Sequence, residues 1–327
     1  MTIIAWIICV VLLLLAAIVA GLMLYAAWTA RRVEKALPPL GRFVEVDGGR
    51  IHYLEAGSGP TLLLIHGLGG QMRNFTHSLL ERLKGDYRLI IVDRPGSGYS
   101  TRPPGASAAI RAQADTVARF MDALRLERPL VVGHSLGGAI ALSLALNHPE
   151  KVGGLALLAP LTHAQSEVPA AFRGLVVTSP PLRWLIGWTL AIPMSIRNRE
   201  LVLGAVFGPN EVPADFATRG GGLLSLRPGN FISASRDLMA TTEDLETMPA
   251  RYAGLKLPVG ILFGTGDRIL DATAQGKAFA EKLPSADFEL IEGDGHMVLM
   301  TSADRSAKFI ARIARRVAER AKLAPVA

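Results

Sequence analysis

Short apolar runs alternate with longer stretches of helix-like spacing along most of this 327-residue chain. Strands that are apolar on both faces are typical of a parallel sheet covered by helices on each side. The expected strands cover residues 61–65, 87–93, 129–133, 153–159, 258–263 and 286–291. The expected helices cover residues 73–83, 108–124, 136–147, 272–282 and 302–320. The alternation predicts an α/β fold with a mostly parallel sheet, preceded by a β-hairpin at residues 43–54.

Residues 161–250 interrupt this alternation. They include Pro180-Pro181 and Gly220-Gly221-Gly222, and their helix-like pieces are short, near residues 182–192 and 197–206. Because the segment falls between two expected core strands, we expect a helical cap over the C-terminal edge of the sheet. The chain would then divide into an anchor at 1–30, a stiff linker at 31–41, the core at 42–160 and 251–327, and the cap at 161–250.

The first part of the chain is long enough to cross a membrane. Ile3 to Trp28 contains no charged side chain, and as a helix it would extend about 39 Å, more than the roughly 30 Å hydrocarbon core. Trp6, Tyr25 and Trp28 lie near its ends, where interfacial aromatic residues are common. A cleaved signal peptide fits less well, because no Lys or Arg precedes the run and residues 1–30 contain no A-x-A pair. We therefore expect a retained helix in contact with membrane lipid.

The formal charge of +7 is unevenly distributed. Arg31, Arg32 and Lys35 directly follow the apolar run, so the positive-inside rule predicts a cytoplasmic catalytic domain. A second basic cluster, at residues 304–322, is either a solvated helix face or a contact with anionic lipid. The single cysteine, Cys9, excludes an intrachain disulfide. Without a metal-binding or nucleotide-binding motif, we expect no metal, no cofactor and no nucleic-acid partner, and the oligomeric state is not predicted.

The clearest chemical signal is Gly133-His134-Ser135-Leu136-Gly137. It lies between an expected strand and an expected helix, which is the setting of a nucleophile elbow, a tight turn that exposes a serine. A serine hydroxyl needs a base to take its proton and a third group to orient that base. Asp267 follows a later strand, and His296 follows Asp267. The order Ser135, Asp267, His296 is that of one hydrolase architecture and of neither common serine protease.

Two other carboxylates compete with Asp267 as the orienting acid. Asp294 is only two residues from His296, which makes a facing geometry awkward. Asp271 falls where the next helix is expected to begin, and it could be the N-cap of that helix.

A further apolar strand at residues 61–65 runs into His66-Gly67-Leu68-Gly69-Gly70, a loop suited to an oxyanion hole. With these elements together, the chain resembles the α/β-hydrolase superfamily, in its esterase/lipase-like serine branch with a helical cap. The resemblance covers about residues 42–160 and 255–318, and includes the stretch from Val92 to Ser100.

This resemblance implies a role for each matching position. Ser135 would be the nucleophile, His296 the general base and Asp267 the residue that orients it. The backbone N–H groups of Leu68 and Leu136 would form the oxyanion hole, and His66 would brace its loop. Relatives that attack with an aspartate, such as dehalogenases and epoxide hydrolases, are excluded by the serine at the elbow.

The sequence therefore predicts a membrane-anchored serine hydrolase that cleaves carboxylic esters, with medium-chain acyl or lipid-like substrates favoured by the apolar cap. Trp184, Leu185 and Trp188 are candidates for an acyl pocket, although apolar cap residues more often pack against the core. Two alternatives stay open. One is a C–C bond hydrolase of ring-cleavage products, for which Arg73, Asn74 and Arg183 could bind the substrate acid. The other is a non-catalytic ligand receptor on the same scaffold.

Overall fold

The computed structural model describes residues 3–323. One sheet of eight strands has the order β1-β2-β4-β3-β5-β6-β7-β8. The strands are β1 (Arg42–Val46), β2 (Gly49–Ala56), β3 (Thr61–Ile65), β4 (Arg88–Val92), β5 (Leu130–His134), β6 (Gly154–Leu158), β7 (Val259–Gly264) and β8 (Asp287–Ile291). All pairs from β4 to β8 are parallel, whereas β2 pairs antiparallel with both β1 and β4. The predicted mostly parallel sheet and its hairpin are confirmed.

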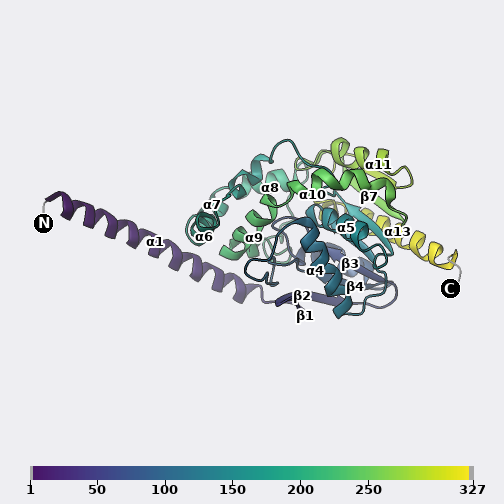
Figure 1. The fold of residues 1–327 in the computed structure, drawn as a ribbon, viewed down its shortest axis with the longest axis horizontal. Helices are drawn as coiled ribbons and strands as arrows, with labels where there is room; N and C mark the ends of the chain where they lie inside the picture. The colour runs from purple at the N-terminus through teal and green to yellow at the C-terminus, as the bar shows by residue number, and fades with distance from the viewer. Residues whose placement is uncertain (1–2, 324–327) are drawn as a thin grey trace.

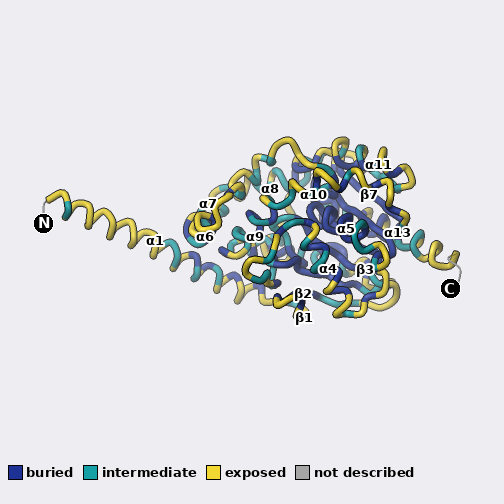
Figure 2. Tube along the Cα trace, in the orientation of Figure 1, coloured by how far each residue is buried: buried dark blue, intermediate teal, exposed yellow. Residues whose placement is uncertain are grey.

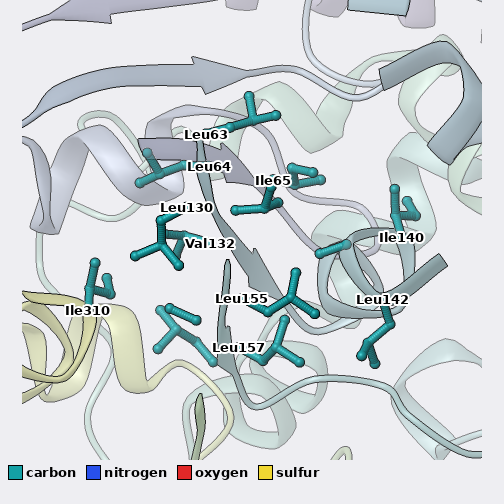
Figure 3. Close-up of a cluster of buried hydrophobic side chains, with 14 of the residues drawn as sticks. Leu63, Leu64, Ile65, Leu130, Val132, Ile140, Leu142, Leu155, Leu157 and Ile310 are labelled. Carbon is teal, nitrogen blue, oxygen red and sulfur yellow. The ribbon is translucent and has the colours of Figure 1, made fainter. Parts of the chain in front are cut away.

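The central strands are buried on both faces, as their unbroken apolar sequences predict. Every residue of β5, β6 and β7 is buried. Ile140 and Ile310, which belong to helices, lie on opposite sides of these strands (Figure 3) and are fully buried. The sheet therefore forms the middle layer of a three-layer core. The loops that follow the parallel strands all begin at its C-terminal edge.

The core helices are α2 (Arg73–Ser78), α3 (Leu80–Leu83), α4 (Ile110–Ala123), α5 (Leu136–Asn147), α11 (Ala278–Lys282), α12 (Val298–Thr301) and α13 (Ala303–Leu323). A single π-helical turn at Thr273–Lys277 leads into α11. The bounds of α4 and α5 match the predicted helices to within about two residues. The predicted helix at 73–83 is instead divided into α2 and α3 at Leu79.

The segment between β6 and β7 is helical, and it lies over one end of the core beside the N-terminal helix (Figure 1). Its helices are α6 (Pro180–Trp188), α7 (Ala191–Arg197), α8 (Arg199–Phe207), α9 (Pro228–Met239) and α10 (Thr242–Thr247), joined by 3₁₀ turns at Ala170–Leu175, Gly222–Leu226 and Met248–Gly254. The helix predicted at 182–192 ends at Trp188, because the ring of Pro193 conflicts with the carbonyl group of Thr189. The helix α9 was not predicted.

The first helix, α1 (Ile3–Ala36), is longer than the predicted anchor. The prediction of a linker from residue 31 was wrong for its first six residues, which continue the helix. Five of them are good helix formers, and the sixth, Val33, is buried against the cap. The helix stops only before Leu37, the residue whose helical conformation Pro38 disfavours. Residues 3–21 project away from the body of the protein, whereas Ala26, Thr29 and Val33 are buried against it (Figure 2).

Candidate active site

Ser135 sits on a sharp corner between β5 and α5. Its backbone has φ 54° and ψ −122°, a conformation that costs a non-glycine residue about 1–3 kcal/mol. The neighbouring glycines make this corner possible. A Cβ on Gly137 would lie 2.1 Å from the carbonyl oxygen of Ile65, and a Cβ on Gly133 would lie 2.7 Å from the Cα of Gly138. The elbow therefore needs glycine for close backbone packing rather than for a positive φ.

His296 and Asp267 form a hydrogen-bonded pair at the same edge of the sheet. The Nδ1 atom of His296 is 2.7 Å from Oδ2 of Asp267, and the two side chains are 5% and 0% exposed. The other oxygen of the carboxylate accepts hydrogen bonds from the backbone N–H groups of Ile269 and Leu270, at 2.8 and 2.9 Å. These bonds fix the carboxylate, so that Asp267 can hold the imidazole ring of His296 in one orientation.

The two competing carboxylates are engaged elsewhere. Asp271 accepts a hydrogen bond from the N–H of Ala274 at 2.7 Å, which is the N-cap type of contact predicted for it. Asp294 is buried, and its Oδ1 accepts hydrogen bonds from the N–H of Gly295 and the hydroxyl of Thr301. Neither carboxylate is hydrogen-bonded to His296 among the residues that the structure describes.

His134 links this pair to the elbow. Its Nε2 donates a hydrogen bond to the carbonyl oxygen of His296 at 3.1 Å, and the two ring centroids are 4.9 Å apart. Since His134 directly precedes Ser135, the contact places His296 beside the serine. Within residues 3–323 no hydrogen bond joins the Ser135 hydroxyl to His296, and such bonds are often long before substrate binds.

The loop after β3 closes the site from the other side. A Cβ on Gly67 would lie 2.8 Å from the Cβ of Ser135, so that the loop backbone rests against the serine. Leu136 opens α5, and the N–H of a first helical residue has no partner within its helix. The N–H of Leu68 donates no hydrogen bond among the described residues. Two N–H groups next to Ser135 are thus available to an incoming oxyanion.

His66 holds this loop in place as a neutral ring. Its Nδ1 donates to the carbonyl oxygen of Gly67 at 2.9 Å, and its Nε2 accepts from the N–H of Arg94 at 3.0 Å. Burial, with the positive charge of Arg94 as the second cause, lowers the pKa of His66 to about 3. A neutral imidazole with one donor and one acceptor is the form that these two contacts require.

Arg94 is the residue that sequence reasoning missed. Its guanidinium is fully buried and donates to the carbonyl oxygens of His66 and Gly67, both at 2.9 Å. The same group forms an ion pair of 2.7 Å with Asp237 on α9 of the cap. The stretch from Val92 to Ser100 carries part of the family resemblance, but nothing in it indicates a partner 143 positions away.

The predicted acyl-pocket residues all lie on α6 of the cap. Trp184 and Leu185 are 49% and 40% exposed on α6, and Trp188 is partly buried beside Trp184, with ring centroids 6.2 Å apart. None of the three contacts Ser135 through a described hydrogen bond or ring contact, so their part in substrate binding stays a prediction.

Comparison with known proteins supports the same architecture. A family model described as "alpha/beta hydrolase fold" matches residues 60–183. A solved structure titled as a membrane phospholipase A and novel bacterial virulence factor is 26% identical, with a TM-score of 0.67, and the match covers 96% of this chain and 98% of that one.

Two curated proteins are also similar in sequence. A 2-hydroxy-6-oxononadienedioate/2-hydroxy-6-oxononatrienedioate hydrolase from Paraburkholderia phymatum is 27% identical over 280 residues, 81% of this chain and 92% of that protein. A dihydrolipoyllysine-residue acetyltransferase component of an acetoin cleaving system from Cupriavidus necator is 40% identical over 121 residues. This chain spans only about a third of the latter protein's length, 32%.

Proposed function

We propose that this chain, which has the fold of the α/β-hydrolase superfamily, is a membrane-anchored serine hydrolase that cleaves carboxylic esters with medium-chain acyl or lipid-like groups. The observation that carries the proposal is the His296–Asp267 pair, held beside an elbow whose serine has a strained backbone. The similarity to a membrane phospholipase A over almost the whole of both chains supports the lipid-like substrate class.

The proposed reaction uses the groups already described. The Oγ of Ser135 attacks the ester carbonyl while His296 takes the hydroxyl proton, and Asp267 stabilises the resulting imidazolium. The N–H groups of Leu68 and Leu136 hold the oxyanion, which then collapses to an acyl-serine while His296 gives its proton to the leaving alcohol. Water, deprotonated by His296, attacks the acyl-serine, and the carboxylic acid leaves with Ser135 restored.

Substitution of Ser135 tests this chemistry. Ser135→Ala should abolish hydrolysis of p-nitrophenyl esters across a range of chain lengths, and a fluorophosphonate probe should label the native chain but not the variant. Labelling that survives the substitution would refute the assignment of the nucleophile.

The alternative of a C–C bond hydrolase has one line of support, the similarity to the Paraburkholderia enzyme. The three side chains expected to bind a dienoate acid are, however, used within the protein. Arg183 donates to the hydroxyl of Ser235, Arg73 to the carbonyl of Pro38, and Asn74 to the carbonyl of Gly220. These contacts favour ester cleavage, and a ring-cleavage product assayed beside the p-nitrophenyl esters separates the two reactions.

The anchor belongs to the same proposal. The apolar part of α1 has a mean hydropathy of 3.3 and is not buried by the protein, as expected of a helix in a bilayer. The chain should stay with membranes in high salt and in alkaline carbonate. The basic residues after the span, Arg31, Arg32 and Lys35, support a cytoplasmic orientation of the catalytic domain. A C-terminal reporter that is active only in the cytoplasm should therefore be active, and the opposite result would refute this orientation.

A further inference from the structure

One segment of the cap exposes several large apolar side chains. On α6, α7 and the turn between them, six large apolar side chains are between 40% and 49% exposed: Leu182, Trp184, Leu185, Leu190, Met194 and Ile196. We call this set the cap face. Exposed apolar residues scattered singly are normal, but a contiguous group on neighbouring helices marks an interaction surface.

The segment that carries the cap face contains almost no ionisable side chains. Between Pro180 and Ile196 the only ionisable side chain is Arg183, and it points inward, where it is 8% exposed and donates to the hydroxyl of Ser235 at 2.9 Å. Charged side chains return at Arg197 and Arg199, both exposed at the end of α7 and the start of α8. An apolar face that contains tryptophan and is bordered by arginine has the composition of a surface in a membrane interface.

The position of the cap face relative to α1 identifies its partner. Residues 3–21 of α1 are free of the protein, and they extend about 28 Å at 1.5 Å per residue, close to the roughly 30 Å hydrocarbon core. From Leu22 onward one side of the helix is covered, with Ala26, Thr29 and Val33 buried, while Leu24 and Trp28 stay exposed; α6 and α9 are among the elements that contact it (Figure 1). The cap therefore begins at the level at which the free helix, and with it the bilayer, ends.

The helix cannot swing freely about this point. Val33 and Leu37 pack with Leu224 of the cap, Glu34 forms an ion pair with Arg227 at 3.5 Å, and the hydroxyl of Tyr99 donates to the carbonyl oxygen of Leu37. These contacts hold α1 in one orientation relative to the cap.

We propose that the cap face docks in the lipid interface beside α1, so that the surface of the bilayer is a binding partner of the cap. The inference rests on the proposed function, because it requires α1 to span a membrane. It adds that the cap itself is immersed at the depth of the headgroups and upper acyl chains, where a lipid-like ester can reach the site without crossing water.

A depth measurement on the full chain in proteoliposomes tests the proposal. In a Cys9→Ser background, Met194→Cys places one thiol on the cap face, and Lys282→Cys places a control thiol on α11, away from α1 (Figure 1). Each is labelled with an environment-sensitive fluorophore. Position 194 should show a blue shift in emission and a loss of fluorescence with lipids spin-labelled near the headgroup, and position 282 should show neither.

Other outcomes of the same samples would overturn the proposal. Equal quenching at 194 and 282, in a chain that resists carbonate and hydrolyses a soluble ester, refutes the cap face alone and leaves the proposed function standing. Protection at 194 that rises with the ratio of protein to lipid, without quenching, assigns the face to a second copy of the chain. Release of the chain by carbonate refutes the anchor and this inference together.

Activity provides the second test. Leu182→Glu puts a charge on the cap face, and Leu290→Glu makes the matched change on β8, where Leu290 is 43% exposed. Leu182→Glu should lower hydrolysis of an ester embedded in vesicles by roughly tenfold, the factor expected for losing burial of one large apolar side chain. It should leave hydrolysis of a short soluble ester unchanged, and Leu290→Glu should change neither. Equal effects on both substrates would contradict the proposal.

Discussion

Arg94 and Asp237 form an ion pair of 2.7 Å in which both side chains are completely buried, and the pair joins the cap to the loop after β3. The rest of the guanidinium binds the carbonyl oxygens of His66 and Gly67. Asp237 also receives a hydrogen bond from Arg102 at 2.5 Å. The backbone that carries the N–H of Leu68 is thus positioned by a carboxylate that belongs to the cap.

Removal of that carboxylate should weaken both the fold and the reaction. Asp237→Asn leaves Arg94 buried without its counter-ion, which typically costs about 3–5 kcal/mol of unfolding free energy. In the variant that remains folded we expect a lower kcat with little change in KM, because the loop would be displaced only around the oxyanion. Asp304→Asn, which removes an exposed partner of Arg82, is the control, and it should change neither the free energy of unfolding nor kcat. An unchanged kcat in Asp237→Asn would show that the loop does not depend on the pair.

The choice of triad acid can be tested against both rivals. Asp267→Asn should lower kcat by about 10³–10⁴-fold, because the amide favours the wrong tautomer of His296. Asp271→Asn and Asp294→Asn should cost far less, since neither carboxylate is bonded to the ring in the described part of the chain. Steady-state kinetics on a p-nitrophenyl ester measure all three. A greater loss at Asp294 would show that the assignment is wrong.

The loop after β3 should not tolerate a single methyl group. Gly67→Ala places a Cβ 2.8 Å from that of Ser135, and both atoms are attached directly to backbone. The loop must then move away from the serine, which should lower kcat by about 10²-fold, the effect of losing one oxyanion donor. Gly85→Ala is the control, because a Cβ there meets nothing within 4 Å. Full activity in Gly67→Ala would contradict the close contact.

Acid should destabilise the fold through two buried histidines. Burial lowers the pKa of both His66 and His134 to about 3, with Arg94 and His296 respectively as the second cause. Between pH 6.5 and about 3 the unfolded chain binds protons at these rings that the folded chain does not. Their contribution to the free energy of unfolding is therefore highest above pH 6.5 and decreases as the pH falls toward 3. Each ring should contribute a slope of about 1.4 kcal/mol per pH unit.

Denaturant titrations in detergent micelles at a series of pH values measure this slope. The variant His134→Gln keeps a donor for the carbonyl of His296 but cannot titrate. Its free energy of unfolding should therefore change less steeply with pH than that of the native chain, by about 1.4 kcal/mol per pH unit. A slope that does not change would exclude His134 as a source of the acid sensitivity.

The sequence predicted what local pattern and strand order determine. Apolar strands, the elbow at Ser135 and the acid at the end of β7 all follow from short-range signals, and parallel strands bring their loops to one edge. Asp237 could not be found in this way, because it lies on a cap helix with no strand before it and its partner is distant in the sequence. The last turns of α1 were missed because they are charged and yet remain helical against the cap.

At Ser135 the residue that the proposed reaction requires is not the residue that would make the fold most stable. At φ 54° and ψ −122° only glycine is free of the steric penalty, so the fold would be more stable with glycine there than with the residue it has. Selection for folding alone would therefore remove this serine. Its presence on a backbone that disfavours it indicates a position maintained for chemistry, at a cost in the free energy of unfolding.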